Sequence, residues 1–276
     1  MIYYEVTIQS SAPYAYDILT AGLAEIGFES FDHEGDVLKA YITEPLYNSE
    51  LLTETCSNYQ KHFELNYSVE KIPYKNWNEV WESNFQPISV GNQLRVRAVF
   101  HEPDTTFPLE LVIQPKMSFG TGHHATTWLV MDTMLGIDFK NKKVMDFGTG
   151  TGILAILANK LGASNVWAVD NDPQCAENAL ENFELNNCND ILLATGNINE
   201  FEGNIYDIVL GNITRNVIVE FLPDISLKLQ AKGLFIASGF YEEDVPILVK
   251  EAQKIGLELI KTNSKDKWCM AIFQKR

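Results

Sequence analysis

Five residues that alternate between glycine and threonine, GTGTG at 148–152, have the clearest chemical content in this sequence. They follow a short apolar run at 143–147 and precede a run with helical spacing at 153–161. Glycines at a strand-to-helix turn let a ligand approach the backbone, and the start of the helix offers free N–H groups and a positive dipole end. The pattern therefore predicts a ligand beside Gly148 and Gly150.

The spacing of these glycines narrows the class of ligand. A dinucleotide-binding fingerprint, G-x-G-x-x-G, would require a glycine where this chain has Ile153. The departure argues against NAD, and hence against a dehydrogenase, and favours an adenosine ligand without a pyrophosphate. The alternative is a tight turn that binds nothing, which its place at the start of an α/β unit disfavours.

Two acidic residues follow the next strand-like run, at 165–169. Asp170 stands at the tip of this strand, about 20 residues after Gly148, where a carboxylate can accept hydrogen bonds from both hydroxyls of a ribose. Asp172 is followed by Pro173, a pairing typical of a helix N-cap and first turn. We therefore expect Asp170 to bind the ligand and Asp172 to start a helix.

Asn212 follows a further strand-like run, at 205–210. The carboxyl end of a strand in an open α/β sheet faces the crevice where ligands bind. The amide oxygen of Asn212 can accept a hydrogen bond from an amine and orient the nitrogen lone pair, which makes Asn212 the candidate catalytic residue. The alternative is an asparagine that only shapes its own loop.

A polar segment at 117–127, MSFGTGHHATT, lies upstream of the glycine turn. Its glycines, its hydroxyls and the helix that follows predict an anion-binding segment over a ligand carboxylate, with Phe119 and Gly120 in it. The adjacent His123 and His124 suit a metal, but no third ligand lies at a metal-site spacing, so we expect no metal.

The order of the expected elements indicates an α/β fold. From residue 115 onward strands alternate with helices, which is typical of a doubly wound, mostly parallel sheet. The expected strands lie at 143–147, 165–169, 191–194, 205–210, 233–238, 257–262 and 269–274. The last two pair across a loop at 263–267, so the final strand is expected to be antiparallel.

Residues 1–72 form a separate small domain in this interpretation. Their pattern is strand, helix, strand, strand, helix, strand, the order of an α+β ferredoxin-like sandwich. No nucleotide motif lies there, so we expect binding or scaffolding. Residues 73–90 are a connector in which Trp77, Val80 and Trp81 share one helical face. The larger domain is then 91–276, beginning with a strand pair at 94–100 and 109–113.

Composition excludes several classes of protein. The net charge is −16, which repels nucleic acid and would attract a basic partner, although taken alone this acidity is better explained as a contribution to solubility. The N-terminus is not typical of a signal peptide, and no apolar run approaches the ~20 residues of a membrane span. The four cysteines have no CxxC spacing, which favours free thiols in a reducing compartment. We expect a cytoplasmic protein with no membrane and no sequence-specific nucleic-acid partner.

Taken together, these motifs resemble the ribosomal protein L11 methyltransferase family over nearly the whole chain. The resemblance rests on NWNEVW at 76–81, FGTGHHATT at 119–127, VMDFGTGTGILAI at 144–156, VWAVDNDP at 166–173 and the NI at 212–213. The glycine and VDNDP motifs are shared by many methyltransferases, whereas the first two are more specific. The family usually has Thr-His-Pro at 123–125, and small or apolar residues at Thr214 and Arg215.

The resemblance implies an S-adenosylmethionine-dependent methyltransferase fold and activity. It implies methylation of lysine side chains and the α-amino terminus of ribosomal protein L11, free or on the ribosome, with the small N-terminal domain recognising it. Carried over by position, the cofactor residues are Thr127, Gly148, Asp170 and Asn212. The alternatives are a methyltransferase for another protein or a small molecule, and a non-catalytic interaction protein on the same scaffold.

Overall fold

The chain divides into two compact units, Met1–Trp81 and Glu82–Arg276. The computed structural model describes residues 2–10, 12, 14–35, 37–72, 85–116 and 118–276. The expected helical face of Trp77, Val80 and Trp81 therefore lies outside the described residues. Each unit has an apolar core of its own.

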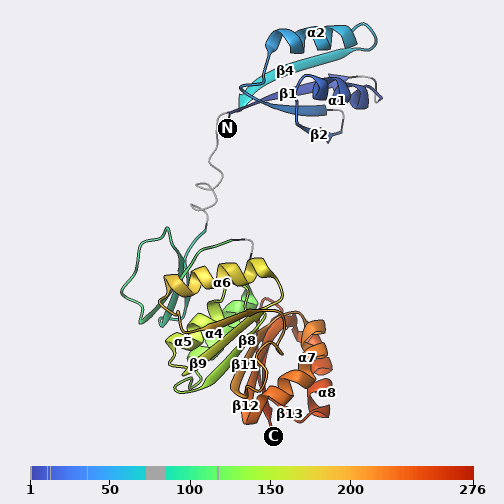
Figure 1. The fold of residues 1–276 in the computed structure, drawn as a ribbon. Coiled ribbons are helices and arrows are strands. Elements are labelled where there is room, and N and C mark those ends of the chain that lie inside the picture. Colours follow the sequence, from blue (N-terminus) through green and yellow to red (C-terminus); the bar gives the residue numbers. More distant parts are fainter. Residues whose placement is uncertain (1, 11, 13, 36, 73–84, 117) are drawn as a thin grey trace. The chain divides into compact units, whose positions relative to one another are not determined.

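The N-terminal unit has the order of elements expected from its sequence (Figure 1). The elements are β1 (Tyr3–Ser10), α1 (Ala15–Glu25), β2 (Ser30–Glu34), β3 (Val37–Thr43), α2 (Ser49–Tyr59) and β4 (Leu65–Ile72). The strands pair in the order β2-β3-β1-β4, and every pairing is antiparallel. Val6 and Ile8 of β1 share one face of this sheet with Leu38 of β3, and that face forms the core with Leu19 of α1 and Leu52 of α2.

The C-terminal unit is built on a seven-stranded sheet of order β10-β9-β8-β11-β12-β14-β13. Strands β8 to β12 run parallel, and β14 lies antiparallel between β12 and β13. The expected mostly parallel sheet with an antiparallel final strand is confirmed. Its strands are β8 (Lys143–Phe147), β9 (Asn165–Asp170), β10 (Leu192–Thr195), β11 (Tyr206–Asn212), β12 (Leu229–Tyr241), β13 (Leu257–Lys265) and β14 (Trp268–Lys275).

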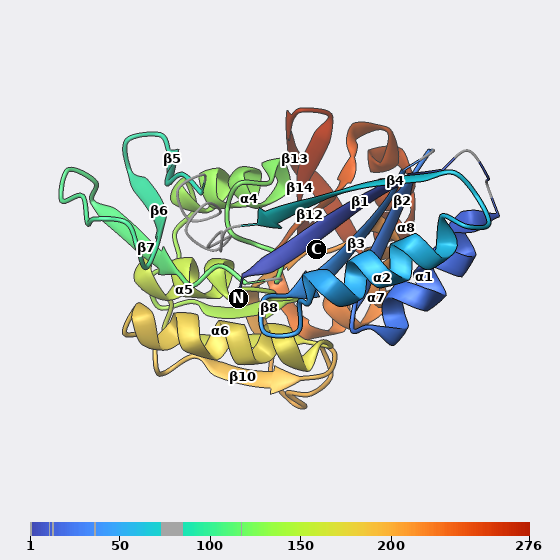
Figure 2. The same cartoon turned by 90° about the horizontal axis from the view of Figure 1, so that it is seen from above.

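Helices cover both faces of this sheet (Figures 1 and 2). They are α4 (Ala125–Leu135), α5 (Ile153–Lys160), α6 (Pro173–Leu185), α7 (Arg215–Lys228), the short η1 (Glu242–Asp244) and α8 (Val245–Lys254). Neighbouring residues of β8 point to opposite faces, so Val144 packs in the core with α4, α5 and α6, whereas Met145 packs in the core with α7 and α8.

The start of the C-terminal unit contains one strand more than expected. The two strands β6 (Leu94–Ala98) and β7 (Leu109–Ile113) pair in parallel, and β5 (Ile88–Val90) adds a third strand from within the expected connector. Apolar residues of this small sheet join the core around α4 and α5. Part of the expected connector thus belongs to the C-terminal unit.

The final hairpin is tighter than expected. Strands β13 and β14 extend to Lys265 and Trp268, which leaves only Asp266 and Lys267 between them. Both turn residues have positive φ angles, 52° and 69°, as a two-residue type I′ turn requires. The predicted five-residue loop at 263–267 is wrong because two non-glycine residues adopt this backbone. Among the described helices, none is long and apolar enough to cross a membrane.

Candidate active site

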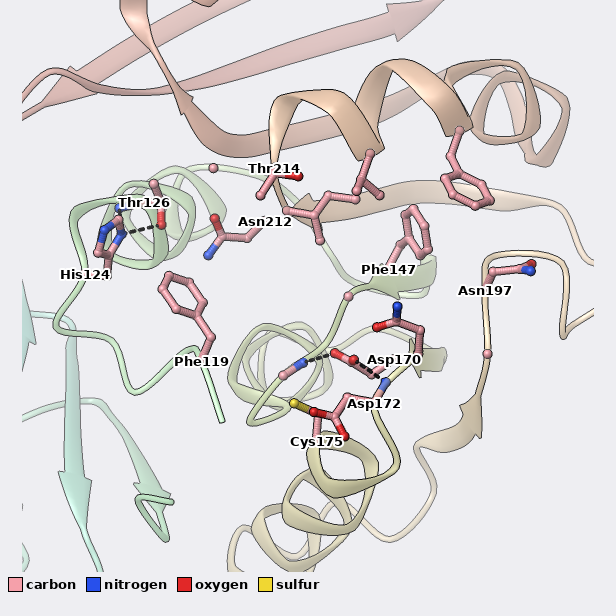
Figure 3. A pocket seen from close by; sticks show the side chains of 18 of the residues that line it. Phe119, His124, Thr126, Phe147, Asp170, Asp172, Cys175, Asn197, Asn212 and Thr214 are labelled. Atoms are coloured by element: carbon pink, nitrogen blue, oxygen red, sulfur yellow. Dashed lines mark hydrogen bonds between the residues drawn. The ribbon is translucent and has the colours of Figure 1, made fainter. Parts of the chain in front are cut away.

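A cavity of about 540 Å³ lies at the carboxyl ends of the parallel strands of the C-terminal unit (Figure 3). From β8 the chain order runs outward through β9 and β10 on one side, and through β11 and β12 on the other. Such a reversal leaves a crevice at the centre of an open sheet. The residues that line the cavity are Phe119, His124, Thr126, Phe147, Gly148, Gly150, Asp170, Asn171, Asp172, Cys175, Gly196, Asn197, Asn212, Ile213, Thr214, Val217, Phe221, Gly239 and Trp268.

The polar segment predicted at 117–127 leads into α4, and we call its part before that helix the 118–124 segment. The glycine turn and the 118–124 segment, predicted separately, are in direct contact. Gly150 has a φ of 55°, and a Cβ there would lie 2.3 Å from the carbonyl oxygen of Phe119. The backbone N–H of Thr151 donates to that same oxygen at 3.0 Å, and its hydroxyl donates to the carbonyl of Gly120 at 2.6 Å. Glycine at 150 is therefore needed for the close approach of the two segments.

The glycine turn does not offer the free N–H groups that its sequence suggested. Gly148 and Thr149 both donate to the carbonyl of Val169, and Gly150 donates to the carboxylate of Asp170. The N–H groups of residues 151 and 152 also donate to backbone carbonyls. Because all five N–H groups have protein acceptors, the turn brings the backbone close to a ligand but does not supply anion donors.

Asp170 ends β9 and points into the cavity, where its residue is 9% exposed. Its Oδ2 accepts from the N–H of Gly150 at 2.8 Å and its Oδ1 from the N–H of Asp172 at 3.0 Å. A carboxylate oxygen accepts two hydrogen bonds, so each retains capacity for a ligand hydroxyl. Asp172 caps α6 through Gln174 N–H at 2.9 Å, as predicted, and also lines the cavity.

Asn212 is the last residue of β11 and has an incomplete set of hydrogen bonds. Its Nδ2 donates to the hydroxyl of Thr127 at 3.0 Å, whereas its Oδ1 is buried without a partner among the described residues. A buried acceptor without a donor is unfavourable, so this oxygen is suited to a donor that a ligand brings. Thr127 is fully buried, and neither it nor Gly120 lines the cavity. Thr127 thus holds the side chain of Asn212 without lining the cavity itself.

Asp146, a fully buried residue of β8, supports the turn from inside the protein. Its Oδ2 accepts from the hydroxyl of Thr149 at 2.6 Å and from the N–H of Ala155 at 3.2 Å. Burial raises the pKa of Asp146 to about 7, and the charge of Asp170 adds to that rise, while the two hydrogen bonds oppose it. The sequence did not single out this residue.

Several lining residues were also missed. Gly196 and Asn197 directly follow β10, so the strand-end rule that found Asp170 could have found them. Trp268 was not assigned to a ligand site, and His124 was included only as part of the polar segment at 117–127, because their shared position depends on a hairpin and a helix start far apart in the sequence. His123 lies elsewhere, with Nε2 2.8 Å from the carbonyl oxygen of Gln86. Among the described residues, no group of three or more His, Cys, Asp or Glu could hold a metal ion.

Comparison with known proteins decides the family. The model of the family described as ribosomal protein L11 methyltransferase (PrmA) matches residues 6–276. The chain belongs to this family. A ribosomal protein L11 methyltransferase from Porphyromonas gingivalis is 42% identical over 98% of this chain and 92% of its own length. One from Bacteroides thetaiotaomicron is 35% identical over 99% of both chains.

Solved structures agree with this assignment to the L11 methyltransferase family. The crystal structure of a ribosomal protein L11 methylase from Lactobacillus delbrueckii subsp. bulgaricus superposes with a TM-score of 0.64 and 26% identity. It covers 70% of this chain and all of its own length. A methyltransferase from Pyrococcus furiosus, at 19% identity and a TM-score of 0.52, shares the fold.

The cavity of this L11 methyltransferase family member fits S-adenosylmethionine. Its volume is in the range of small-molecule sites. Asp170 retains acceptors for ribose hydroxyls, and the glycine turn leaves room for close approach. The unpartnered Oδ1 of Asn212 and the apolar surface of Phe147 are consistent with an amine and a purine in the same cavity.

Proposed function

We propose that this protein transfers the methyl group of S-adenosylmethionine to amino groups of ribosomal protein L11, on lysine side chains and at the α-amino terminus. The observation that carries the proposal is the buried, unpartnered Oδ1 of Asn212, a residue that lines the cavity in a chain of the L11 methyltransferase family. Asp170, Gly148 and Gly150 would hold the cofactor, with Phe119 and Gly120 in the segment over it.

When bound, the cofactor supplies a methyl group on a cationic sulfonium, and the attacking amine must be neutral. Removing the proton of a lysine at pH 7 costs about 4–5 kcal/mol, whereas an α-amino group costs about 1 kcal/mol. The oxygen of Asn212 accepts an N–H of the neutral amine and so directs its lone pair. Thr127 accepts from Nδ2 and thereby fixes the orientation of the amide. The contribution of these residues is therefore positioning.

The N-terminal unit is, in this proposal, a ferredoxin-like domain that recognises the protein substrate. Its order β2-β3-β1-β4, its antiparallel pairings and its two helices support the fold. Residues 1–72 would form this domain, 73–90 the connector and 91–276 the methyltransferase domain, which also takes up β5. The protein would act in the cytoplasm on L11, free or on the ribosome. A net charge of −16 argues against direct sequence-specific contacts to nucleic acid.

Mass spectrometry of L11 after incubation with the protein and isotopically labelled cofactor tests the proposal. We expect label on lysine side chains and on the α-amino group, and none when S-adenosylhomocysteine replaces the cofactor. Calorimetry with S-adenosylmethionine and with NAD accompanies it. A protein that binds S-adenosylmethionine but leaves L11 unlabelled would act on another protein or a small molecule. A protein that binds neither ligand would be a non-catalytic interaction protein.

A further inference from the structure

Three asparagines follow one side of α6, four residues apart. Asn178 and Asn182 lie within the helix, Asn186 caps its C-terminal end, and all three are buried. Positions four apart on a helix lie above one another on the same face, so the three amides form a row. We name this row the amide ladder. A buried amide is costly unless its oxygen and nitrogen find hydrogen-bond partners, and here most of the partners lie in and just after β7.

The amide ladder takes the place of a strand beside β7. In the sheet order β5-β6-β7 this strand is at the edge, where backbone N–H and C=O groups are left unpaired (Figure 2). Asn186 accepts from Val112 N–H at 2.9 Å and donates to Val112 C=O at 2.7 Å. Two residues on, Gln114 N–H donates to Asn182 Oδ1 at 2.7 Å, and its carbonyl accepts from Asn178 Nδ2 at 3.1 Å. Four helical residues advance by about 6 Å and two strand residues by about 6.6 Å, so the two repeats match.

Asn182 differs from the other two amides because it reaches beyond β7. Its Nδ2 donates to the carbonyl of Thr151, in the glycine turn, at 2.8 Å. One buried side chain therefore bridges Gln114 N–H and Thr151 C=O. Thr151 itself donates to the carbonyls of Phe119 and Gly120 through its N–H and its hydroxyl. The chain that leaves β7 at Gln114 is thus tied to Thr151 twice, through Asn182 at its start and directly at Phe119.

Two neighbouring side chains show what is particular to Asn182. Nδ2 of Asn186 donates to the carbonyls of Val112 and Asn182, which uses both of its N–H groups. Phe183 packs against the glycine turn, since a Cβ at Gly152 would lie 2.5 Å from its ring. Apolar packing is non-directional, so it brings α6 against the turn without fixing a backbone group there. The hydrogen bond from Asn182 does fix one.

We infer that Asn182 is a positioning residue for cofactor binding, and that its bridge holds the 118–124 segment where the cofactor requires it. Asn182 is fully buried and does not line the cavity, so it acts through the backbone on either side. Phe119 does line the cavity and is 52% exposed, so its place depends on backbone anchors rather than on a surrounding core. Ordering the segment in advance lowers the entropic cost of binding.

A matched pair of variants on the amide ladder tests the inference. Asn182→Asp keeps the acceptor for Gln114 N–H but loses the donor to Thr151, so the dissociation constant for S-adenosylmethionine should rise by about 10-fold in calorimetry. Asn186→Asp makes the same exchange one helical turn along and keeps the acceptor for Val112 N–H. It should lower thermal stability comparably, with a dissociation constant within about 2-fold of the wild type. Equal rises in the two variants, or unchanged affinity in Asn182→Asp, would overturn the inference.

Hydrogen exchange in the wild-type protein tests the same bridge without a substitution. Because coupling is reciprocal, a bridge that favours cofactor binding must itself be strengthened by the cofactor. Saturating S-adenosylhomocysteine should slow exchange of the Gln114 amide, which Asn182 holds, by about 10-fold more than that of the Val112 amide, which Asn186 holds. Neither Gln114 nor Val112 lines the cavity, so direct contact with the ligand does not account for such a difference. Equal slowing of the two amides would overturn the inference.

The inference rests on the part of the proposed function that places S-adenosylmethionine in this cavity, and Asp170→Ala separates the two. Weaker binding in both Asp170→Ala and Asn182→Asp is the expected result. If only Asp170→Ala loses affinity, the cofactor site stands and the role of Asn182 is wrong. If Asp170→Ala binds the cofactor as tightly as the wild type, the proposed cofactor site and the role of Asn182 fail together.

Discussion

At the scale of single residues, the carboxylate of Asp170 both holds the glycine turn and faces the cavity. Asp170→Ala should weaken binding of S-adenosylmethionine by about 1–3 kcal/mol, because acceptors for the ribose and for Gly150 N–H are lost together. Calorimetry measures the change. Asp172→Ala is the matched control, since it removes a helix cap beside the same cavity and should leave affinity nearly intact. Wild-type affinity in a folded Asp170→Ala protein would remove Asp170 from the site.

Asn212 is expected to act on the rate more than on the affinity. An acceptor that orients the attacking nitrogen works mainly in the transition state, and a misplacement of about 1 Å can cost about 10²-fold. Asn212→Ala should therefore lower the single-turnover rate at saturating cofactor by about 10²-fold, with a much smaller change in the dissociation constant. Thr127→Val keeps the Asn212 amide but removes the hydroxyl that accepts from it, and should lower the single-turnover rate by less than Asn212→Ala does. A normal rate at saturation would limit Asn212 to binding.

Asp146 should make stability depend on pH. Burial raises its pKa to about 7, so the folded protein keeps a proton that the unfolded chain releases near pH 4. Its contribution to the free energy of unfolding is thus full at low pH and is lost as pH rises from about 4 to 7, by up to about 1.4 kcal/mol per unit. Asp146→Asn has no such proton, so its free energy of unfolding should not fall in this way. Urea unfolding at several pH values between about 4 and 7 should show the free energy of unfolding of the variant rising relative to that of the wild type. A difference in the free energy of unfolding between the two proteins that stays constant over this pH range would contradict the raised pKa of Asp146.

These residues also show what a sequence can reveal about a site. Asp170 and Asn212 were found because strand ends in an open sheet meet at one edge, a rule that needs no distant contact. Trp268 was missed because its position at the cavity depends on the two-residue turn before it. That turn needs a positive φ angle at Lys267, which a lysine in the sequence does not predict. Thr127 was assigned to the cofactor by resemblance, yet it lies behind Asn212.

At the scale of elements, the contact between the glycine turn and the 118–124 segment can be tested at one position. Gly150→Ala places a Cβ against the carbonyl of Phe119 and should cost about 1–3 kcal/mol of stability beyond the backbone strain. It should also weaken cofactor binding, because the segment must shift. Gly91→Ala is the matched control, since Gly91 has a φ of 54° and open space around it. Equal thermal stability and affinity in the two variants would show that the contact is unimportant.

Element identities were more predictable than the connections between them. Alternating apolar runs gave the strands of the large sheet, and Asp172-Pro173 marked the start of α6. The turn at 148–152 was located correctly, but its N–H groups proved to be occupied by Val169, Asp170 and other acceptors from neighbouring segments. Those partners depend on which strands lie side by side, and periodicity along one strand carries no such information.

At the scale of the whole molecule, the proposed function divides chemistry and recognition between two units. The cavity and its described lining residues belong to the C-terminal unit, which has cores on both faces of its own sheet. The N-terminal unit has a separate core and antiparallel sheet. Because neither core draws on the other unit, removing one is expected to leave the other folded.

Deletion of residues 1–72 should therefore leave the affinity for S-adenosylmethionine nearly unchanged but lower kcat/KM for L11 by at least about 10²-fold. The physical reason is effective concentration: a tethered recognition domain holds the substrate near the cavity, and such linkage can be worth 10²–10⁴-fold. A short peptide that carries a target lysine but too little of L11 to engage the domain is the matched substrate, and both proteins should methylate it equally slowly. Initial rates on L11 and on the peptide, with calorimetry for the cofactor, separate the effects. If the truncated protein methylated L11 at the full rate, recognition would have to lie within the C-terminal unit.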